Sequence, residues 1–182
     1  ARDFGAVPDG VTLNTVSIQA AIDFVSAHGG GNVVLDNGDY VSGSIYLKDG
    51  VTLWIDEDCS LLGSLNPFDY VRDPVANWTA LVFAIGQKDI GIEGGGTING
   101  RGFEIATRFI DFVHLGVFED PLNHDRLQEG KRPENIHFYK CEGIVIRDIT
   151  LRDPGCWNQQ YDKCRGILVE RVNVDAKSYW NN

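Results

Sequence analysis

The sequence offers few groups of side chains whose spacing matches a known kind of catalysis. The acidic run Asp56-Glu57-Asp58 places three carboxylates together, and paired carboxylates can act as general acid and base. Three adjacent acids directly after a strand are, however, typical of a solvated turn. The histidines at positions 28, 114, 124 and 137 have no zinc-like spacing with the four cysteines. We therefore expect neither a metal site nor a cofactor.

Two further catalytic or binding motifs are missing. The glycine-rich segment 94–100 lacks the G-x-x-x-x-G-K-[ST] pattern of a phosphate loop, and we expect a solenoid turn there that does not lead into a helix. No G-x-S-x-G elbow is present, so serine-hydrolase chemistry has no motif to support it. The remaining candidates are neutral side chains, namely Trp157, Gln160 and Asn181. An indole ring stacks on flat surfaces, and amides donate and accept hydrogen bonds.

A repeat of 23 residues predicts the scaffold that positions these side chains. The segment CEGIVIRDITL at 141–151 aligns with CRGILVERVNV at 164–174. Apolar residues alternate before and after a break at Arg147-Asp148, which predicts a strand, a corner and a second strand. A period in the twenties with two strands per repeat is typical of a solenoid coil.

The charges at this corner support the same register. A shift of 23 residues places Arg147 over Glu170 and Asp148 over Arg171. Adjacent coils stack as parallel strands about 4.8 Å apart, so like charges at these positions would repel. Exposed ion pairs add little stability, and we expect these pairs to specify the register instead.

One amphipathic helix is predicted at 14–28, as a cap over the end of the stack. Its apolar face follows the i, i+3, i+4, i+7 spacing of Ile18, Ala21, Ile22 and Val25. Asn14 or Thr15 can cap its start, and the glycines at 29–31 end it. Short strand signals follow at 33–35, 44–47, 51–55, 60–62, 81–85 and 90–92. Residues 103–131 are predicted as an inserted loop, with at most a helical turn at 106–112.

Composition agrees with a folded chain rich in strands and turns. Apolar residues make up 43% of the 182 residues, and there are 21 glycines. The formal charge of −10 leaves no strongly basic face, so we expect no nucleic-acid partner. No apolar run approaches the ~18 residues of a membrane span, so we expect no membrane association. Cys141 and Cys164 share one position in successive coils, and we favour buried thiols there over a disulfide.

Several segments together resemble the polygalacturonase-like enzymes of glycoside hydrolase family 28. The opening DFGAVPDG at 3–10 resembles the start of many pectin-lyase-like β-helix proteins and does not separate hydrolases from lyases. More specific are GSIYLKDGVTL (43–53), CSLLGS (59–64), GGGTINGRG (94–102) and ITLRDPGCW (149–157). The resemblance implies an all-β, right-handed, single-stranded parallel β-helix with an N-terminal α-helical cap. Residues 1–182 would then form the N-terminal portion of one β-helix domain.

The resemblance also implies hydrolysis of pectic polysaccharide that contains galacturonic acid, with inversion at the anomeric carbon. An inverting glycosidase needs an acid for the leaving oxygen and a carboxylate ~6.5–9.5 Å away that activates water. The family carries its chemistry in Asn-x-Asp, Asp-Asp, Gly-His-Gly and Arg-x-Lys motifs, of which only the first asparagine is matched, at Asn181. We therefore expect the catalytic acids beyond residue 182 and no activity from the 182 residues alone.

The same resemblance places Trp157 and Gln160 on the substrate face, one coil before Asn181. We predict all three as substrate-binding residues, with a tryptophan packed in a turn as the alternative for Trp157. Gln160 takes a position where relatives often carry histidine. The expected partner is a pectic polysaccharide or oligosaccharide, and the expected location is secreted or periplasmic.

Two alternatives accompany this interpretation. The chain could be a non-catalytic β-helix that binds glycans or serves as a structural module. A polysaccharide lyase on the same fold would need calcium-binding acids and a basic residue acting as base, and we see no such cluster. The open end of the last coil is a candidate surface for self-association, because an uncovered solenoid end needs a cap or a partner.

Overall fold

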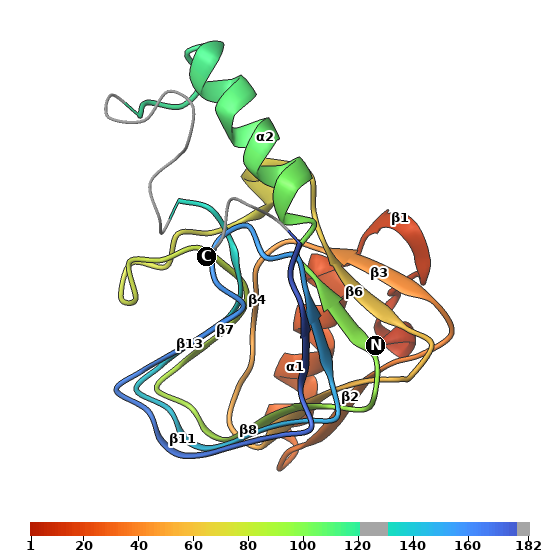
Figure 1. The fold of residues 1–182 in the computed structure, drawn as a ribbon. Helices are drawn as coiled ribbons and strands as arrows, with labels where there is room; N and C mark the ends of the chain where they lie inside the picture. Colours follow the sequence, from red (N-terminus) through yellow and green to blue (C-terminus); the bar gives the residue numbers. More distant parts are fainter. Residues whose placement is uncertain (121–130, 178–182) are drawn as a thin grey trace.

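The computed structural model describes residues 1–120 and 131–177, and its architecture is a parallel β-helix with three faces (Figure 1). Each face is one sheet, and its strands come from successive coils of the chain. Every pairing between neighbouring strands of these sheets is parallel. This arrangement confirms the predicted solenoid.

The three sheets differ in length and in the coils that they contain. Sheet A consists of β1 (Asp9–Leu13), β3 (Asp39–Ser42), β6 (Ser60–Gly63), β9 (Thr97–Asn99), β12 (Thr150–Arg152) and β15 (Asn173–Asp175). Sheet B consists of β2 (Gly31–Leu35), β5 (Val51–Ile55), β8 (Lys88–Glu93), β11 (Glu142–Arg147) and β14 (Arg165–Glu170). Sheet C consists of β4 (Ile45–Tyr46), β7 (Ala80–Ile85), β10 (Glu134–Tyr139) and β13 (Gln159–Asp162).

A complete coil passes through sheet C, sheet B and sheet A, so it has three strands where the repeat predicted two. The predicted pair corresponds to the strands in sheets B and A. In sheet C, strands at the positions of β4 and β7 were predicted, but β10 and β13 were missed. The sequence of β13, QQYD, is polar and shows no apolar alternation. The short strands predicted between residues 33 and 92 all overlap strands of the structure, and all but 44–47 lie wholly within them.

The predicted register of the last two coils is confirmed. Ile144 pairs with Ile167, and Arg147 pairs with Glu170. Arg171 Nε lies 2.5 Å from Asp148 Oδ1, and this hydrogen bond holds the pKa of Asp148 below its usual range. The other charge pair differs from expectation.

Arg147 forms its ion pair with Glu93 of the preceding coil, and Glu170 pairs with the neighbouring Arg171. A long arginine side chain reaches coils on either side, so backbone register alone does not select its partner.

Stacked apolar side chains fill the interior. In sheet B, one column runs through Val33, Leu53, Ile92, Ile146 and Val169. In sheet A, another runs through Tyr40, Leu61, Ile98, Leu151 and Val174. The inner members of both columns are buried, whereas Val169 and Val174 in the last described coil remain 46% and 53% exposed. Each coil therefore buries the apolar surface of the one before it.

Helix α1 (Thr15–Ala27) confirms the predicted cap. It buries Ile18, Ala21 and Ile22 against the first coils and follows the short 3-10 helix η1 (Arg2–Phe4). Asn14 is the N-cap residue by position, but its side chain does not bond to the helix. It bridges the preceding segment instead, accepting from the Val7 amide at 2.7 Å and donating to the Val7 carbonyl at 3.0 Å.

The predicted loop at 103–131 begins with a helix. Helix α2 (Gly102–His114) follows directly after the glycine-rich segment, so the expectation that this segment leads into no helix is wrong. Its buried side chains are Ile105, Ala106 and Phe109. They lie at positions i, i+1 and i+4 and form an apolar stripe along the helix. The charged residues Glu104, Arg108 and Asp111 around this stripe concealed it in the sequence. Figure 1 shows α2 projecting beyond the sheets, beside the 3-10 helix η2 (Pro67–Asp69).

All four cysteines are free in the structure. Cys141 and Cys164 lie in successive coils, with the Cys141 amide 3.4 Å from Cys164 Sγ. Burial raises the pKa of the Cys141 thiol to about 11, so the thiol stays protonated at neutral pH. The two thiols are therefore free, as we favoured over a disulfide, although only Cys141 is buried and Cys164 is partly exposed.

The adjacent glycines Gly29 and Gly30 provide a test of how closely the coils approach. Both have positive φ angles, of 97° and 92°. A Cβ on Gly30 would lie 2.6 Å from the Gly50 carbonyl oxygen of the next coil, whereas a Cβ on Gly29 would have no atom within 4 Å. We expect Gly30→Ala to lower the free energy of unfolding by at least ~1 kcal/mol more than Gly29→Ala. Urea denaturation measures both, and equal losses would show that the coils can separate without cost.

Candidate functional site

A row of side chains crosses the outer face of sheet C. Strand register aligns Tyr46 with Phe83, Phe83 with His137, and His137 with Gln160. Residues adjacent to these along the strands, such as Ile136, belong to the buried core. Because side chains alternate between the two faces of a strand, the aligned row points outward. The rings of Tyr46 and Phe83 stack with centroids 5.0 Å apart.

A loop that precedes β7 covers part of this row. Asp73 organises the loop, because its carboxylate accepts hydrogen bonds from the amides of Val75 and Ala76 at 2.8 and 2.7 Å. The Asp73 amide donates to the Trp78 carbonyl at 2.8 Å. The Trp78 ring lies over His137, with centroids 6.1 Å apart. The loop thus places an indole on the sheet C face.

Trp157 extends the aromatic surface into the next coil. It follows β12 and precedes β13, as predicted for a turn between coils, and its ring centroid lies 5.2 Å from that of Trp78. Trp157 is 37% exposed. The ring contacts Trp78, as in the alternative of a tryptophan packed on its neighbours, while part of the residue remains accessible. Contact between Trp157 and a substrate stays a prediction.

His137 lies between carboxylates at the centre of the row. Its side chain is fully buried, with Nδ1 2.8 Å from Glu134 Oε2 and Nε2 3.8 Å from Asp162 Oδ2. Gln160 Nε2 donates to Asp162 Oδ2 at 2.8 Å. Gln160 Oε1 is buried and has no hydrogen-bond partner among the described residues. The structure therefore brings Trp157 and Gln160 to the same neighbourhood, linked through Trp78 and His137.

The third predicted site residue, Asn181, lies outside the described residues. In the sequence, asparagines recur at an interval of 23 residues before it. Asn135 Nδ2 donates to Asn158 Oδ1 at 2.8 Å, and these two residues are 23 positions apart. Another step of 23 along the sequence leads to Asn181.

These groups can bind a polar ligand with flat apolar surfaces. Indole rings supply stacking surfaces, and the amide of Gln160 with the carboxylate of Asp162 supplies hydrogen-bonding groups. Within residues 1–120 and 131–177, no three histidine, cysteine or acidic side chains gather to hold a metal ion. None of the described helices is long and apolar enough to cross a membrane.

Known proteins share this architecture and much of the sequence. A putative glycosyl hydrolase from Parabacteroides merdae is 33% identical, with a TM-score of 0.85, and the match covers 96% of this chain and 72% of that one. The family 28 exopolygalacturonase of Yersinia enterocolitica is 25% identical with a TM-score of 0.80, over 96% of this chain and 38% of that one. A probable polygalacturonase from Vitis vinifera is 29% identical over 96% of this chain and 36% of its own length.

The chain belongs to the polygalacturonase-like glycoside hydrolases. Its fold is the right-handed parallel β-helix of that family, with the N-terminal helix in place. No protein-family model matches the sequence. The chain spans about a third of the length of the Vitis vinifera relative.

Part of the sequence is shared more widely than this family. Mannuronan C5-epimerase AlgE4 of Azotobacter vinelandii is 52% identical over 60 residues, which is 29% of this chain. Similarity over a segment of that length therefore occurs between proteins whose names state different reactions. The family assignment depends on matches over nearly the whole chain.

Sequence reasoning missed several residues of the sheet C face. Trp78, His137, Tyr46 and Asp162 were not among the predicted site residues. One signal could have found His137, because the 23-residue offset that relates the coils links it to Gln160. No comparable signal marks Trp78, since its position depends on the conformation of a loop.

The pKa of Tyr46 tests the environment of this face. Burial and then the nearby Asp73 carboxylate, whose Oδ2 lies 3.3 Å from the hydroxyl, raise the pKa of Tyr46 to about 12. The folded state thus favours the neutral phenol, which contributes stability below the unfolded pKa of about 10. This contribution is lost as the pH rises from about 10 towards 12. We expect Tyr46→Phe to reduce the dependence of the unfolding free energy on pH in this range.

Urea denaturation at intervals between pH 8 and 11 measures this dependence. Tyr139→Phe is the matched variant. The hydroxyl of Tyr139 is exposed, and the nearby Lys163 lowers its pKa, which is the opposite direction from Tyr46. An equal pH dependence for the wild-type protein and Tyr46→Phe would contradict the assigned environment.

Proposed function

We propose that this chain supplies the N-terminal coils and part of the substrate face of an enzyme that hydrolyses pectic polysaccharide containing galacturonic acid, with inversion at the anomeric carbon. The observation that carries the proposal is the aromatic and amide surface of sheet C, formed by Trp78, Trp157 and Gln160. Membership of the polygalacturonase-like family supports the choice of substrate. A protein that meets a plant polymer would be secreted or periplasmic, and we include that location in the proposal.

Within this proposal, Trp157 stacks on a sugar ring and Gln160 hydrogen-bonds to a hydroxyl or carboxylate. The exposed part of the Trp157 ring provides the stacking surface. Gln160 Nε2 donates one hydrogen to Asp162 and has a second hydrogen for a ligand. Asn181 would add a second amide to the same face. The two acids required for inversion, ~6.5–9.5 Å apart, are proposed to come from downstream coils.

The stereochemistry of the product tests the proposed reaction. We expect the complete gene product to release sugars whose first-formed anomer has the configuration opposite to that of the scissile bond, because water attacks from the face opposite the leaving group. Time-resolved proton NMR during cleavage of polygalacturonate measures this. The 182-residue chain, assayed alongside, should give no product.

Other outcomes of the NMR experiment contradict parts of the proposal. Retention of configuration would exclude inversion, and an unsaturated product would indicate a lyase. Binding of polygalacturonate without cleavage by the complete protein would favour the non-catalytic glycan-binding alternative.

The role of Trp157 requires a separate variant. We expect Trp157→Ala in the complete protein to raise KM about tenfold, which corresponds to a loss of about 1.4 kcal/mol of binding. Trp54→Ala is the matched control, because Trp54 lies on sheet B and donates its Nε1 hydrogen to Asp56. Steady-state kinetics on oligogalacturonates measure both variants. Equal KM values for the two variants would show that Trp157 does not contribute to substrate binding.

A further inference from the structure

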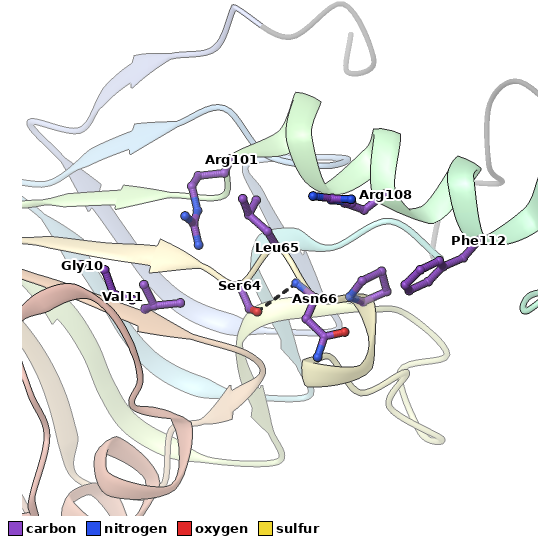
Figure 2. Close-up of a pocket in the computed structure, with 10 residues that line it drawn as sticks. Gly10, Val11, Ser64, Leu65, Asn66, Arg101, Arg108 and Phe112 are labelled. Atoms are coloured by element: carbon purple, nitrogen blue, oxygen red, sulfur yellow. Dashed lines mark hydrogen bonds between the residues drawn. The ribbon is translucent and has the colours of Figure 1, made fainter.

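A hollow lies away from the sheet C face, between α2 and the turns that follow sheet A (Figure 2). Its volume is about 470 Å³, within the range of about 300–1,000 Å³ that is typical of small-molecule sites. Arg101 and Arg108 line it on the helix side, and Val11 of β1 lies on the opposite side. The sheet C residues described above do not line it.

The two arginines have unused hydrogen-bonding capacity. Arg101 precedes α2 and donates one hydrogen bond, from Nε to the Gly63 carbonyl at 2.6 Å, which orients its guanidinium. Arg108 lies on an exposed part of α2. Among the described residues, neither arginine forms an ion pair with a carboxylate.

The other polar side chains of the hollow are already engaged. Ser64 donates to the Asp69 carboxylate and accepts from the Asn66 amide at 3.0 Å. Asn66 Nδ2 donates to Asp69 at 3.1 Å, and its Oδ1 accepts from the Phe68 amide at 3.2 Å. Asp69 itself does not line the hollow. The groups that remain available to a ligand are therefore mainly the guanidinium donors.

The charge of the lining contrasts with that of the chain. The chain carries a formal charge of −10, but the residues that line the hollow include two arginines and no acidic residue. A cleft lined by one sign of charge concentrates ligands of the opposite sign. A guanidinium matches the planar, two-oxygen geometry of a carboxylate. Leu65, Phe112 and Val11 supply apolar surface that can contact the carbon-bound hydrogens of a sugar ring.

We propose that this hollow binds a uronate unit of a pectic chain, as a second binding site separate from the sheet C face. Arg101 and Arg108 bind the carboxylate, and the apolar side chains contact the ring. The choice of a uronate over other anions rests on the proposed function. A polymer held at two sites on one protein dissociates more slowly, because the second contact is intramolecular.

Methyl and indole NMR signals can report on the two sites separately. Trigalacturonate is titrated into the protein while the Val11 and Leu65 methyl signals monitor the hollow and the Trp157 indole NH monitors sheet C. We expect Arg108→Gln to raise the Kd obtained from the methyl signals about tenfold, because one of two carboxylate-binding groups is lost. The Kd obtained from the Trp157 signal should not change.

Controls separate uronate binding from other causes. Arg165→Gln changes an exposed arginine on sheet B that pairs with Glu142, and it should leave the methyl-derived Kd unchanged. Arg108 makes no hydrogen bond to the described residues, so Arg108→Gln should preserve the fold, which the wild-type-like spectrum outside the hollow verifies. Arg101→Gln serves as the second variant. It removes the other guanidinium group, and it also removes the hydrogen bond from Arg101 to the Gly63 carbonyl.

Several outcomes would overturn the proposal. These are the absence of methyl shifts with trigalacturonate, equal shifts with the neutral galactotriose, and equal shifts with inorganic phosphate at the same concentration. Shifts of the methyl signals without any change of the Trp157 indole signal would instead contradict substrate binding at the sheet C face. They would still support uronate binding in the hollow. Failure of the second site is thereby distinguished from failure of the proposed function.

Discussion

Parallel pairing between successive coils is the constraint on which the rest of this structure depends. A single strand cannot satisfy its own backbone donors and acceptors, so each coil requires the hydrogen bonds of its neighbours. The same pairing fixes which side chains stack. Because Ile92, Ile146 and Val169 occupy one column, the apolar interior continues from coil to coil. A change of register by one residue would turn the apolar side chains outward.

The outer face of sheet C follows from the same register. The side chains of Tyr46, Phe83, His137 and Gln160 form a row because their strands pair in parallel. Ring contacts, such as the stacking of Tyr46 on Phe83, then add to the alignment. Loops then add what the strands cannot supply. Asp73 holds the loop that carries Trp78 through amide hydrogen bonds, and that indole contacts both His137 and Trp157. The site thus combines the regular strands of sheet C with an irregular loop that covers part of them.

Much of the fold could be predicted from the sequence, because stacking repeats the same apolar pattern at a fixed interval. The solenoid, the N-terminal cap and the pairing of Ile144 with Ile167 were all predictable in this way. Two strands of sheet C, β10 and β13, were not predicted, and the sequence of β13, QQYD, is polar without any apolar alternation. Trp157 and Gln160 came from family resemblance, and the structure shows their common neighbours. The position of Trp78 could not be predicted from the sequence, because the loop that holds it has no repeat.

Helix α2 illustrates how this architecture separates stability from specificity. Ile92 pairs with Ile146 across the insertion that contains α2, and Ile146 pairs with Val169 across an ordinary corner. The two steps give the same stacking, although the first spans more than twice as many residues. A long segment between two strands can therefore differ in length and sequence while the strand pairing stays the same. Evolution or an engineer can replace the segment that bears Arg108 and keep the strand pairing, provided that the new segment covers the core as Ile105 and Phe109 do. New ligand preferences can then arise without a new fold.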